Sequence, residues 1–499
     1  LCVSSAVWAD KPTYEPFLRI ETGQHTSMIE RLATNATGSL LVTASRDKTI
    51  RLWDVRSGML RTVFRPPIGP GKIGMMFAVD ISPDGRFVAA GGITSSSAEP
   101  ENVYVFDVAT GQLIRRISGL PGIVYHLRFF PDNTRLAVLL KNGGLRVFKV
   151  IGGYELFRDA DYGEDATGLD IDATGNMVVS CLDGFVRLYD TQQKRIAKTA
   201  ARGQPYTVRF SPDGSKIAVG YLGKARVEVF SGRTAELLYR VAGLDTVAVK
   251  DLAAIAWLAH GPQVCAGGEF LTDRSYILCW ERGGKGKMIR IEATTDTVQG
   301  LVALPDGRLI FGSRDPAWGI ISRGRRGQFI GPSNADLRGS PGEFLVSKDG
   351  DTVGFSYAPH GKFPARFTVS ERALSTNVVS DSALFPASSS VPGMAFTGYP
   401  GMDTFRLNNR PVLAIKNHEE VRVIAASRIS AWFIAGTARY LRCITSDGEQ
   451  KWATPTPSET EAVNISGDER FVTAAFNDGT IRWYAARDGK EVLALFLSI

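Results

Sequence analysis

Short runs of apolar and β-branched residues alternate with polar turns along almost the whole chain. The first clear copy of this pattern has three runs, at 40–45, 49–54 and 60–64, each long enough for one strand. Asp47-Lys48 and Ser57-Gly58 separate the runs, and residues of these types are typical of tight turns. The pattern predicts a unit of three or four antiparallel strands.

The same unit recurs about every 40 residues, a period typical of a β-propeller blade. The turn between its first two strands is rich in Pro, Asp and Gly, which favour tight turns. The copies of this turn are Ala36-Thr37-Gly38, Ser82-Pro83-Asp84-Gly85, Pro131-Asp132-Asn133, Ala173-Thr174-Gly175, Ser211-Pro212-Asp213-Gly214, His260-Gly261-Pro262, Pro305-Asp306-Gly307, Lys348-Asp349-Gly350, Pro392-Gly393, Ser427-Arg428 and Ser466-Gly467-Asp468. A second series of turns, from Ser57-Gly58 to Asp488-Gly489, gives the same number of units, which is eleven.

A single blade cannot bury both of its faces, so we expect the units to stack into closed rings. Eleven blades are too many for one ordinary propeller, and the sequence therefore predicts an all-β fold of tandem propellers in two rings. We assign residues 11–332 to a first propeller of about seven blades and residues 333–499 to a second, divergent one of four or five. A division into six and five blades is the alternative.

The composition suits a globular β protein and limits the classes of partner. Of 499 residues, 44% are hydrophobic, and the 52 glycines and 24 prolines match the many expected turns. No apolar run has the length of a membrane-spanning helix. The formal net charge of +7 is modest for this length, so an anionic partner is an option and a general nucleic-acid role is not favoured.

The N-terminus and the cysteines bear on the cellular compartment. Residues 1–10 are similar to the end of a secretory signal, with Val7 and Ala9 before a cleavage point, so we expect export to the periplasm or beyond. The alternative is a buried apolar strand in a cytoplasmic protein. The five cysteines form no Cys-x-x-Cys pair, which argues against a zinc site. Cys265 and Cys279 flank one predicted hairpin; we expect two buried thiols, and a disulfide is the alternative.

The clearest copy of the unit resembles a repeat of the WD-repeat family. The segment 41–54 ends in Trp53-Asp54, and Gly23-Gln24-His25 lies upstream, near the Gly-His position of that family. The resemblance covers residues 21–300 well and the remainder only through period and turns. It implies a propeller that binds other proteins and a buried hydrogen-bonded network within the blade. The residues that match this network are His25, Ser45, Asp47 and Trp53.

A finer resemblance concerns the export-like N-terminus, the degenerate repeats and the segment 486–496. Together these features are similar to the repeat region of bacterial WD-repeat proteins that also carry a caspase-like protease domain. The resemblance implies a sensor or scaffold region beside a Cys–His protease. No part of this chain matches the protease domain, so no catalytic residue is carried over.

Three patterns with catalytic or ligand-binding potential have a simpler structural explanation. His25, Ser45 and Asp47 have the composition of a hydrolase triad, but no Gly-x-Ser-x-Gly surrounds Ser45. The segment 69–73 lacks the first Gly and the Ser/Thr of a phosphate loop. The five histidines lie in different units without metal-ligand spacing. We therefore expect no catalytic residue, no cofactor and no metal site in this chain.

A group of basic residues is the most distinctive surface feature. It flanks the third turn of two consecutive units, and a propeller places equivalent turns side by side on one face. Such a patch is a candidate docking site for an acidic protein, phosphate or an anionic lipid headgroup, and two solvated loops are the alternative. Its members are Arg282, Lys285, Lys287, Arg290, Arg323, Arg325 and Arg326.

These observations favour a protein-interaction scaffold or sensor whose partners are other proteins. We expect contact at loops around the channel, including 46–48, 95–100 and 359–362. One alternative is the regulatory region of a caspase-like cysteine protease whose catalytic domain is not in this chain. A second is a binder of an anionic ligand or nucleic acid through the basic face. A third, an enzyme with a site in the channel, would need several carboxylates or histidines on inner strands, and we expect few.

Overall fold

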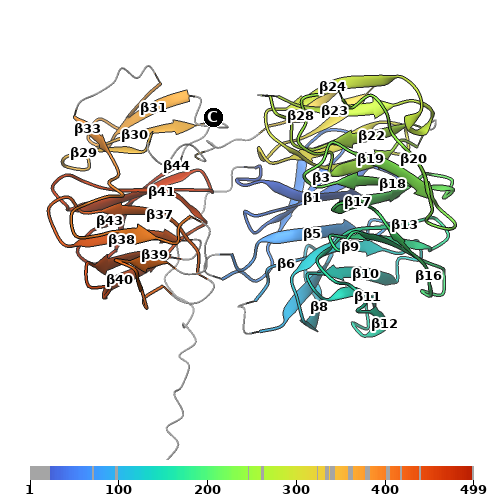
Figure 1. Ribbon diagram of the computed structural model, residues 1–499, viewed down its shortest axis with the longest axis horizontal. Helices are drawn as coiled ribbons and strands as arrows, with labels where there is room; N and C mark the ends of the chain where they lie inside the picture. Colours follow the sequence, from blue (N-terminus) through green and yellow to red (C-terminus); the bar gives the residue numbers. More distant parts are fainter. Residues whose placement is uncertain are drawn as a thin grey trace, which may run out of the picture. The chain divides into compact units, whose positions relative to one another are not determined.

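A computed structural model of the chain describes residues 23–496, with gaps at 70–71, 96–98, 246, 260–262, 273, 323, 332–336, 338–342, 358–362, 377–382, 401–404, 416–418 and 438–439. Within these residues the protein has 44 β-strands and one short 3-10 turn, η1 (Arg282–Gly284). The strands form eleven antiparallel sheets, most of them four-stranded (Figure 1). The prediction of an all-β chain with eleven blades is confirmed. No helix of the described residues is long and apolar enough to cross a membrane.

The chain divides into two compact units. One, the seven-sheet unit, comprises Gly23–Ile68 and Ile73–Ser333. Its sheets, in chain order, are β1 (Ile29–Thr34), β2 (Leu40–Ser45), β3 (Ile50–Asp54) and β4 (Leu60–Phe64); β5 (Met76–Ile81), β6 (Phe87–Gly92), β7 (Glu101–Asp107) and β8 (Leu113–Leu120); β9 (Val124–Phe129), β10 (Arg135–Leu140), β11 (Gly144–Lys149) and β12 (Glu155–Asp159); β13 (Ala166–Ile171), β14 (Met177–Cys181), β15 (Phe185–Tyr189) and β16 (Arg195–Ala200); β17 (Pro205–Phe210), β18 (Lys216–Tyr221), β19 (Val227–Ser231) and β20 (Leu237–Arg240); β21 (Ala254–Trp257), β22 (Val264–Gly267), β23 (Ser275–Trp280) and β24 (Met288–Thr294); and β25 (Val298–Ala303), β26 (Leu309–Ser313), β27 (Trp318–Ser322) and β28 (Arg325–Ile330).

The other, the four-sheet unit, includes residues from 334 onward and departs more from a regular blade. Its first sheet has five strands in the order β32-β31-β30-β29-β33, and its second has three. The strands are β29 (Leu345–Ser347), β30 (Thr352–Tyr357), β31 (Phe363–Thr368), β32 (Ala373–Ser375) and β33 (Leu384–Pro386); β34 (Phe396–Thr397), β35 (Arg406–Leu407) and β36 (Arg410–Pro411); β37 (Val421–Ala426), β38 (Trp432–Thr437), β39 (Tyr440–Thr445) and β40 (Gln450–Pro455); and β41 (Thr460–Ile465), β42 (Phe471–Phe476), β43 (Thr480–Ala485) and β44 (Glu491–Phe496).

Serine side chains hold the turn between the first and second strands, which explains why the Ser-Pro-Asp-Gly pattern marks it. Ser82 Oγ accepts hydrogen bonds from the backbone N–H groups of Arg86 at 3.1 Å and Phe87 at 2.9 Å. Gly85 has a φ of 77°, a conformation that glycine adopts without a steric penalty. The equivalent serines that accept a backbone N–H in other sheets are Ser211, Ser347 and Ser466.

In the seven-sheet unit the first strand of each sheet contacts the first strand of the next, so these strands are the inner ones. The last inner strand, β25, also contacts the first, β1, so the seven sheets form a closed ring. Side-chain packing closes the ring: the Trp53 and Trp318 ring centroids are 5.5 Å apart. Gly300 and Gly312 let Leu32 approach the backbone, because a Cβ there would lie 2.6 Å and 2.9 Å from Leu32 Cδ2.

Cys265 and Cys279 form a disulfide, so the expectation of two buried thiols was wrong. They lie opposite each other in the β22–β23 ladder, and their Cα atoms are 4.1 Å apart. The sequence indicated a hairpin but not its register, and a shift of one residue would have pointed the two side chains to opposite faces. Cys181 and Cys443 are buried free thiols. Residues 1–10, with the signal-like segment, lie outside the described residues.

Candidate functional site

A buried side-chain network joins the segment before β1 to strands β2 and β3. His25 Nδ1 lies 2.8 Å from Asp47 Oδ2, and His25 Nε2 lies 2.7 Å from Thr43 Oγ1. Trp53 Nε1 donates to the same Thr43 oxygen at 2.9 Å. Burial opposes ionisation of Asp47, but the contacts with His25, Arg51 and Thr49 together outweigh it and hold the pKa of Asp47 well below its usual range. The geometry is that of a structural relay, since every group is buried.

Ser45 does not bridge the imidazole and the indole, which is the role that the sequence suggested for it. Its Oγ donates to the carbonyl oxygen of Ser27 at 2.8 Å and accepts from the N–H of Asp47 at 3.0 Å. The hydroxyl between imidazole and indole belongs to Thr43, which the sequence analysis did not select. Thr43 and Ser45 are two residues apart on one strand and so share a face, and only the packed positions of the two rings decide between them.

Buried arginines recur on third strands, two residues before an aromatic residue. Arg187 on β15 pairs with Asp183 at 2.5 Å, and Arg482 on β43 pairs with Glu491 at 2.8 Å. Both arginines are at most 1% exposed. Each ion pair ties the third strand to the preceding turn or to the outer strand, so these arginines hold the blade together.

Six inner strands of the seven-sheet unit have a β-bulge at their second residue. Three of these bulge residues, Phe77, Tyr125 and Tyr206, are aromatic and partly exposed. The Phe77 and Tyr125 ring centroids are 6.1 Å apart, and the Arg46 guanidinium lies 5.6 Å from the Phe77 ring. Arg46 also pairs with Glu30. We call the six bulge residues the aromatic layer: Glu30, Phe77, Tyr125, Thr167, Tyr206 and Gln299.

Three positions further along the inner strands, charges alternate over four consecutive sheets. These residues, called here the charged layer, are Asp80, Arg128, Asp170 and Arg209. Arg128 lies 3.5 Å from Asp80 and 3.2 Å from Asp170. The equivalent positions in the other three sheets hold Ala33, Ala256 and Val302. Two carboxylates of this layer, Asp80 and Asp170, therefore lie on inner strands, where few were expected from the sequence.

Each aspartate of the charged layer also joins two inner strands. Asp80 Oδ2 accepts the N–H of Phe129 at 2.6 Å, and Asp170 Oδ2 accepts the N–H of Phe210 at 2.9 Å. Burial raises the pKa of Asp80 to about 6, although Arg128 favours its carboxylate form. Burial and repulsion by neighbouring guanidinium groups lower the pKa of Arg209 to about 10, although Asp170 opposes this shift.

The basic patch proposed from the sequence is partly assembled by the outer strands. Arg326 Nη1 on β28 donates to the carbonyl oxygen of Ala293 on β24 at 2.8 Å, which holds the two outer strands together. The Lys285 ammonium lies 4.2 Å from the Tyr239 ring, and the Arg290 guanidinium lies 3.4 Å from the Tyr276 ring. Arg323 lies outside the described residues.

The six described cations of the basic patch are exposed, and in this described part of the chain none of them forms an ion pair. Of the loops expected to meet partners, residues 46–48, 95 and 99–100 are described, whereas 96–98 and 359–362 are not. Among the described residues no group of three His, Cys, Asp or Glu side chains is placed to hold a metal ion.

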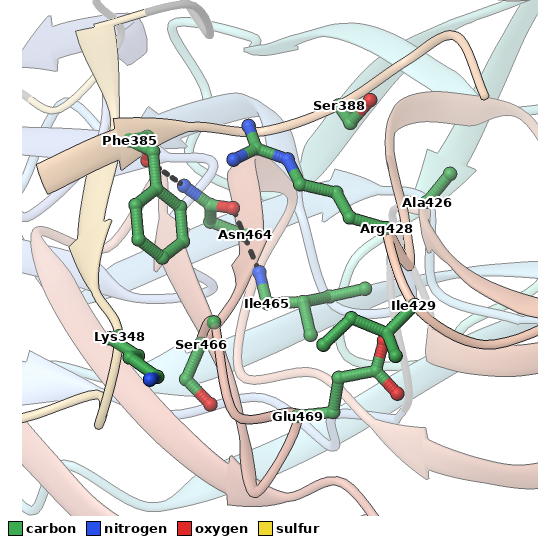
Figure 2. A pocket seen from close by; sticks show the side chains of 11 residues that line it. Lys348, Phe385, Ser388, Ala426, Arg428, Ile429, Asn464, Ile465, Ser466 and Glu469 are labelled. Atoms are coloured by element: carbon green, nitrogen blue, oxygen red, sulfur yellow. Dashed lines mark hydrogen bonds between the residues drawn. The ribbon is translucent and has the colours of Figure 1, made fainter.

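A pocket of about 270 Å³ lies in the four-sheet unit, at the turns that follow β29, β37 and β41 (Figure 2). Phe385, Ile429 and Ile465 contribute apolar wall. Asn464 Nδ2 donates to the carbonyl oxygens of Phe344 at 2.9 Å and Phe385 at 3.0 Å, so its amide is held in place. The pocket therefore has a fixed polar floor beside apolar walls.

The charged groups of this pocket are largely engaged by the protein itself. Glu469 accepts hydrogen bonds from Ser427, from Ser430 at 2.6 Å and from Trp432 Nε1 at 3.3 Å. Burial would raise the pKa of Glu469, but these bonds lower it. Arg428 donates to the carbonyl oxygen of Pro386 at 2.5 Å. The pocket suits contact with an apolar side chain of a partner better than acid–base chemistry.

The family described as "WD domain, G-beta repeat" matches residues 18–54. This segment contains His25, Thr43, Asp47 and Trp53, the residues of the buried relay. The first sheet therefore carries a WD repeat. The ten sheets beyond the matched segment continue the same antiparallel pattern, most of them with four strands.

The chain is similar to distant relatives in several groups. It is 25% identical over 205 residues to the periodic tryptophan protein 2 homolog of Dictyostelium discoideum, covering 36% of this chain and 21% of the relative. It is 26% identical over 230 residues to periodic tryptophan protein 2 of Saccharomyces cerevisiae, covering 38% and 24%. It is 28% identical over 129 residues to the guanine nucleotide-binding protein subunit beta of Arabidopsis thaliana, covering 26% and 33%. The chain thus spans at most a third of the length of these relatives.

Proposed function

We propose that this WD-repeat protein is a protein-interaction scaffold or sensor, not an enzyme, and that the aromatic layer with Arg46 is its main contact site. The observation that carries the proposal is the set of partly exposed aromatic residues, Phe77, Tyr125 and Tyr206, on three inner strands. Aromatic and arginine side chains dominate the binding energy of protein interfaces. A partner segment that lies over the ring would meet all three aromatic side chains.

Rigid presentation is the physical advantage of this arrangement. Each aromatic residue sits at a bulge inside a paired strand, so its backbone is fixed before a partner arrives. The contact between Arg46 and the Phe77 ring further limits side-chain freedom at this end of the channel. Binding then costs little ordering entropy, and a larger share of the contact energy appears as affinity.

The experiment compares partner capture by the full chain and by two double variants. In Tyr125→Ser/Tyr206→Ser the aromatic layer loses two rings. In the control, Tyr154→Ser/Leu156→Ser, two apolar side chains of the outer edge, 57% and 44% exposed, are removed instead. We expect cross-linked partners identified by mass spectrometry to be lost from the first variant and kept by the second. An unchanged set of cross-linked partners in the first variant would contradict the proposal.

A second candidate is an anionic partner or nucleic acid at the basic patch, favoured by its six exposed cations without ion pairs among the described residues. The variant Arg282→Ser/Lys287→Ser/Arg325→Ser removes three of them. We expect it to weaken binding of an acidic partner and to reduce the dependence of binding on salt. Binding that does not change with salt would exclude this candidate.

We also propose that the protein is exported, to the periplasm or outside the cell. The disulfide between Cys265 and Cys279 supports this, because such bonds persist in oxidising compartments. Fractionation of the native host with an antibody against the chain tests it, and a purely cytoplasmic signal would contradict it. A role as the regulatory region of a caspase-like protease stays a prediction, since neither the family match nor the named relatives bear on it.

A further inference from the structure

The inner strands of the seven-sheet unit carry three arginines, Arg31, Arg128 and Arg209, and the acidic residues on these strands are Asp80, Asp170 and Glu30. Glu30 is already paired with Arg46, which leaves the three arginines beside two aspartates. Both aspartates are engaged by Arg128 and by backbone N–H groups. Arg31 and Arg209 are therefore left without a carboxylate at ion-pair distance among the described residues.

Of these arginines, Arg31 has the least favourable environment. Its side chain reaches from β1 to β9, where Nη2 donates to the carbonyl oxygen of Tyr125 at 3.1 Å. The residue is only 8% exposed, and its Nε has no hydrogen-bond partner among the described residues. A guanidinium group removed from water without a counter-charge and with an unused donor is costly. An anion bound beside Arg31 would lower the free-energy cost of burying its guanidinium group.

Arg209, which is partly exposed, also has no carboxylate at ion-pair distance among the described residues. Within the described residues, its Nη1 donates to the carbonyl oxygens of Leu169 at 3.2 Å and Val208 at 2.9 Å. The guanidinium groups of Arg31 and Arg128 are close enough to disfavour its charged form. Residues of small or medium size, Ala256 and Val302, occupy its layer in the next two sheets, so no side chain there competes for its donors.

His126 contributes a further unused polar atom to this region. It lies on β9, is 3% exposed, and its Nδ1 has no hydrogen-bond partner in the described part of the chain. Burial and the three arginines lower the pKa of His126, so the ring is neutral and one of its nitrogens is a donor. The guanidinium and imidazole donors come from three different inner strands, β1, β9 and β17, and surround one region of the channel.

We propose that the channel of the seven-sheet unit binds a phosphate-class oxyanion between Arg31 and Arg209, with His126 as an additional donor. Guanidinium groups suit such ligands because their N–H donors match the spacing of oxyanion oxygens. Phosphate presents several directed acceptor oxygens, whereas chloride presents none. The ligand is inorganic phosphate or the phosphate group of a small molecule.

The direct test is calorimetric titration of the full chain with inorganic phosphate in chloride buffer at constant ionic strength. We expect saturable binding at one site, weakened about tenfold or more in Arg209→Gln and in Arg31→Gln. Lys194→Gln, which removes an exposed cation of the same unit outside the basic patch, is the matched control and should bind phosphate as the wild type does. Parallel titrations with sulfate and with phosphoserine separate the two sources: tighter binding of phosphoserine indicates a phosphorylated small molecule as the ligand.

Thermal unfolding supplies an independent result that does not require the variants to bind. In chloride alone, Arg209→Gln should melt at or above the temperature of the wild type, because it removes an uncompensated charge. In saturating phosphate the order should reverse, since only the wild type gains ligand stabilisation. The proposal is overturned if the wild type binds neither phosphate nor sulfate saturably, or if both arginine variants keep wild-type affinity. Neither result would affect the proposed partner site in the aromatic layer.

Discussion

Replacing Thr43 by valine tests whether this hydroxyl, and not that of Ser45, links the imidazole and the indole of the first blade. Valine has nearly the shape of threonine, so the change removes an oxygen without creating a cavity. The change removes a longer bond to the carbonyl oxygen of Arg51 at 3.5 Å and two side-chain hydrogen bonds, one with His25 Nε2 at 2.7 Å and one from Trp53 Nε1 at 2.9 Å. Both partners are at most 2% exposed, so water cannot replace the lost acceptor.

The expected loss of unfolding free energy follows from the two groups that lose their hydrogen-bond partner, the Trp53 indole N–H and the His25 imidazole nitrogen. A buried donor left without an acceptor costs about 1–3 kcal/mol, and the indole N–H has no alternative role because it is a donor only. The imidazole nitrogen adds a similar cost, partly shared because the bonds form one network. We expect Thr43→Val to lower the stability by about 2–4 kcal/mol. Urea unfolding followed by circular dichroism measures this quantity.

A matched control separates the relay from a general effect of threonine removal. Thr473 on β42 is also fully buried, and its hydroxyl has no hydrogen-bond partner among the described residues. Thr473→Val should therefore be neutral or slightly stabilising. A loss below about 0.5 kcal/mol for Thr43→Val, or equal losses for the two variants, would refute the reasoning.

Nitrogen-15 labelling of the tryptophans reports the bond itself. The chain has 8 tryptophans, so the indole N–H signals can be assigned by single substitutions. Thr43→Val should shift the Trp53 indole signal and speed its hydrogen exchange, because the bond to Thr43 Oγ1 is gone. Ser45→Ala should leave that signal in place, since Ser45 Oγ contacts backbone groups instead. An indole signal that responds to Ser45→Ala alone would restore the sequence-based assignment.

Three further predictions concern ring closure, the disulfide and the charged layer. Leu32→Ala should cost about 2–5 kcal/mol in urea unfolding, because the removed side chain packs where the ring closes, and a loss under about 1 kcal/mol would contradict closure by this packing. Cys265→Ser/Cys279→Ser should lower the unfolding free energy by up to about 3 kcal/mol, because the disulfide closes a short loop and so limits the entropy of the unfolded chain. Thiol labelling of the denatured, unreduced wild type should leave these two cysteines unlabelled. Burial raises the pKa of Asp80 to about 6, so between about pH 4 and about pH 6 the folded protein keeps a proton on Asp80 that the unfolded chain has lost. The contribution of Asp80 to stability is therefore lost as the pH rises from about 4 to about 6. Asp80→Asn should remove roughly 2–3 kcal/mol of this pH dependence of the unfolding free energy.

The sequence by itself determined the repeated unit and the number of sheets. Strand runs and turn residues act locally: a Ser-Pro-Asp-Gly turn forms through bonds within a few residues, as the Ser82 Oγ contacts demonstrate. Counting such turns therefore counts blades, even in the irregular four-sheet unit. The pairing of His25 with Asp47 was also predictable, because a buried aspartate needs a partner and the repeat supplies one at a fixed distance along the chain.

Only the tertiary structure decided which side chains meet across blades or in register. The choice of Thr43 over Ser45, the disulfide between Cys265 and Cys279, and the reach of Arg31 to the Tyr125 carbonyl depend on atoms placed by strand pairing and by closure of the ring. These residues are far apart in sequence or share a strand face, so no local pattern distinguishes them. The physical reason is that strand periodicity fixes the face on which a side chain lies, whereas its partner is fixed only by packing in three dimensions.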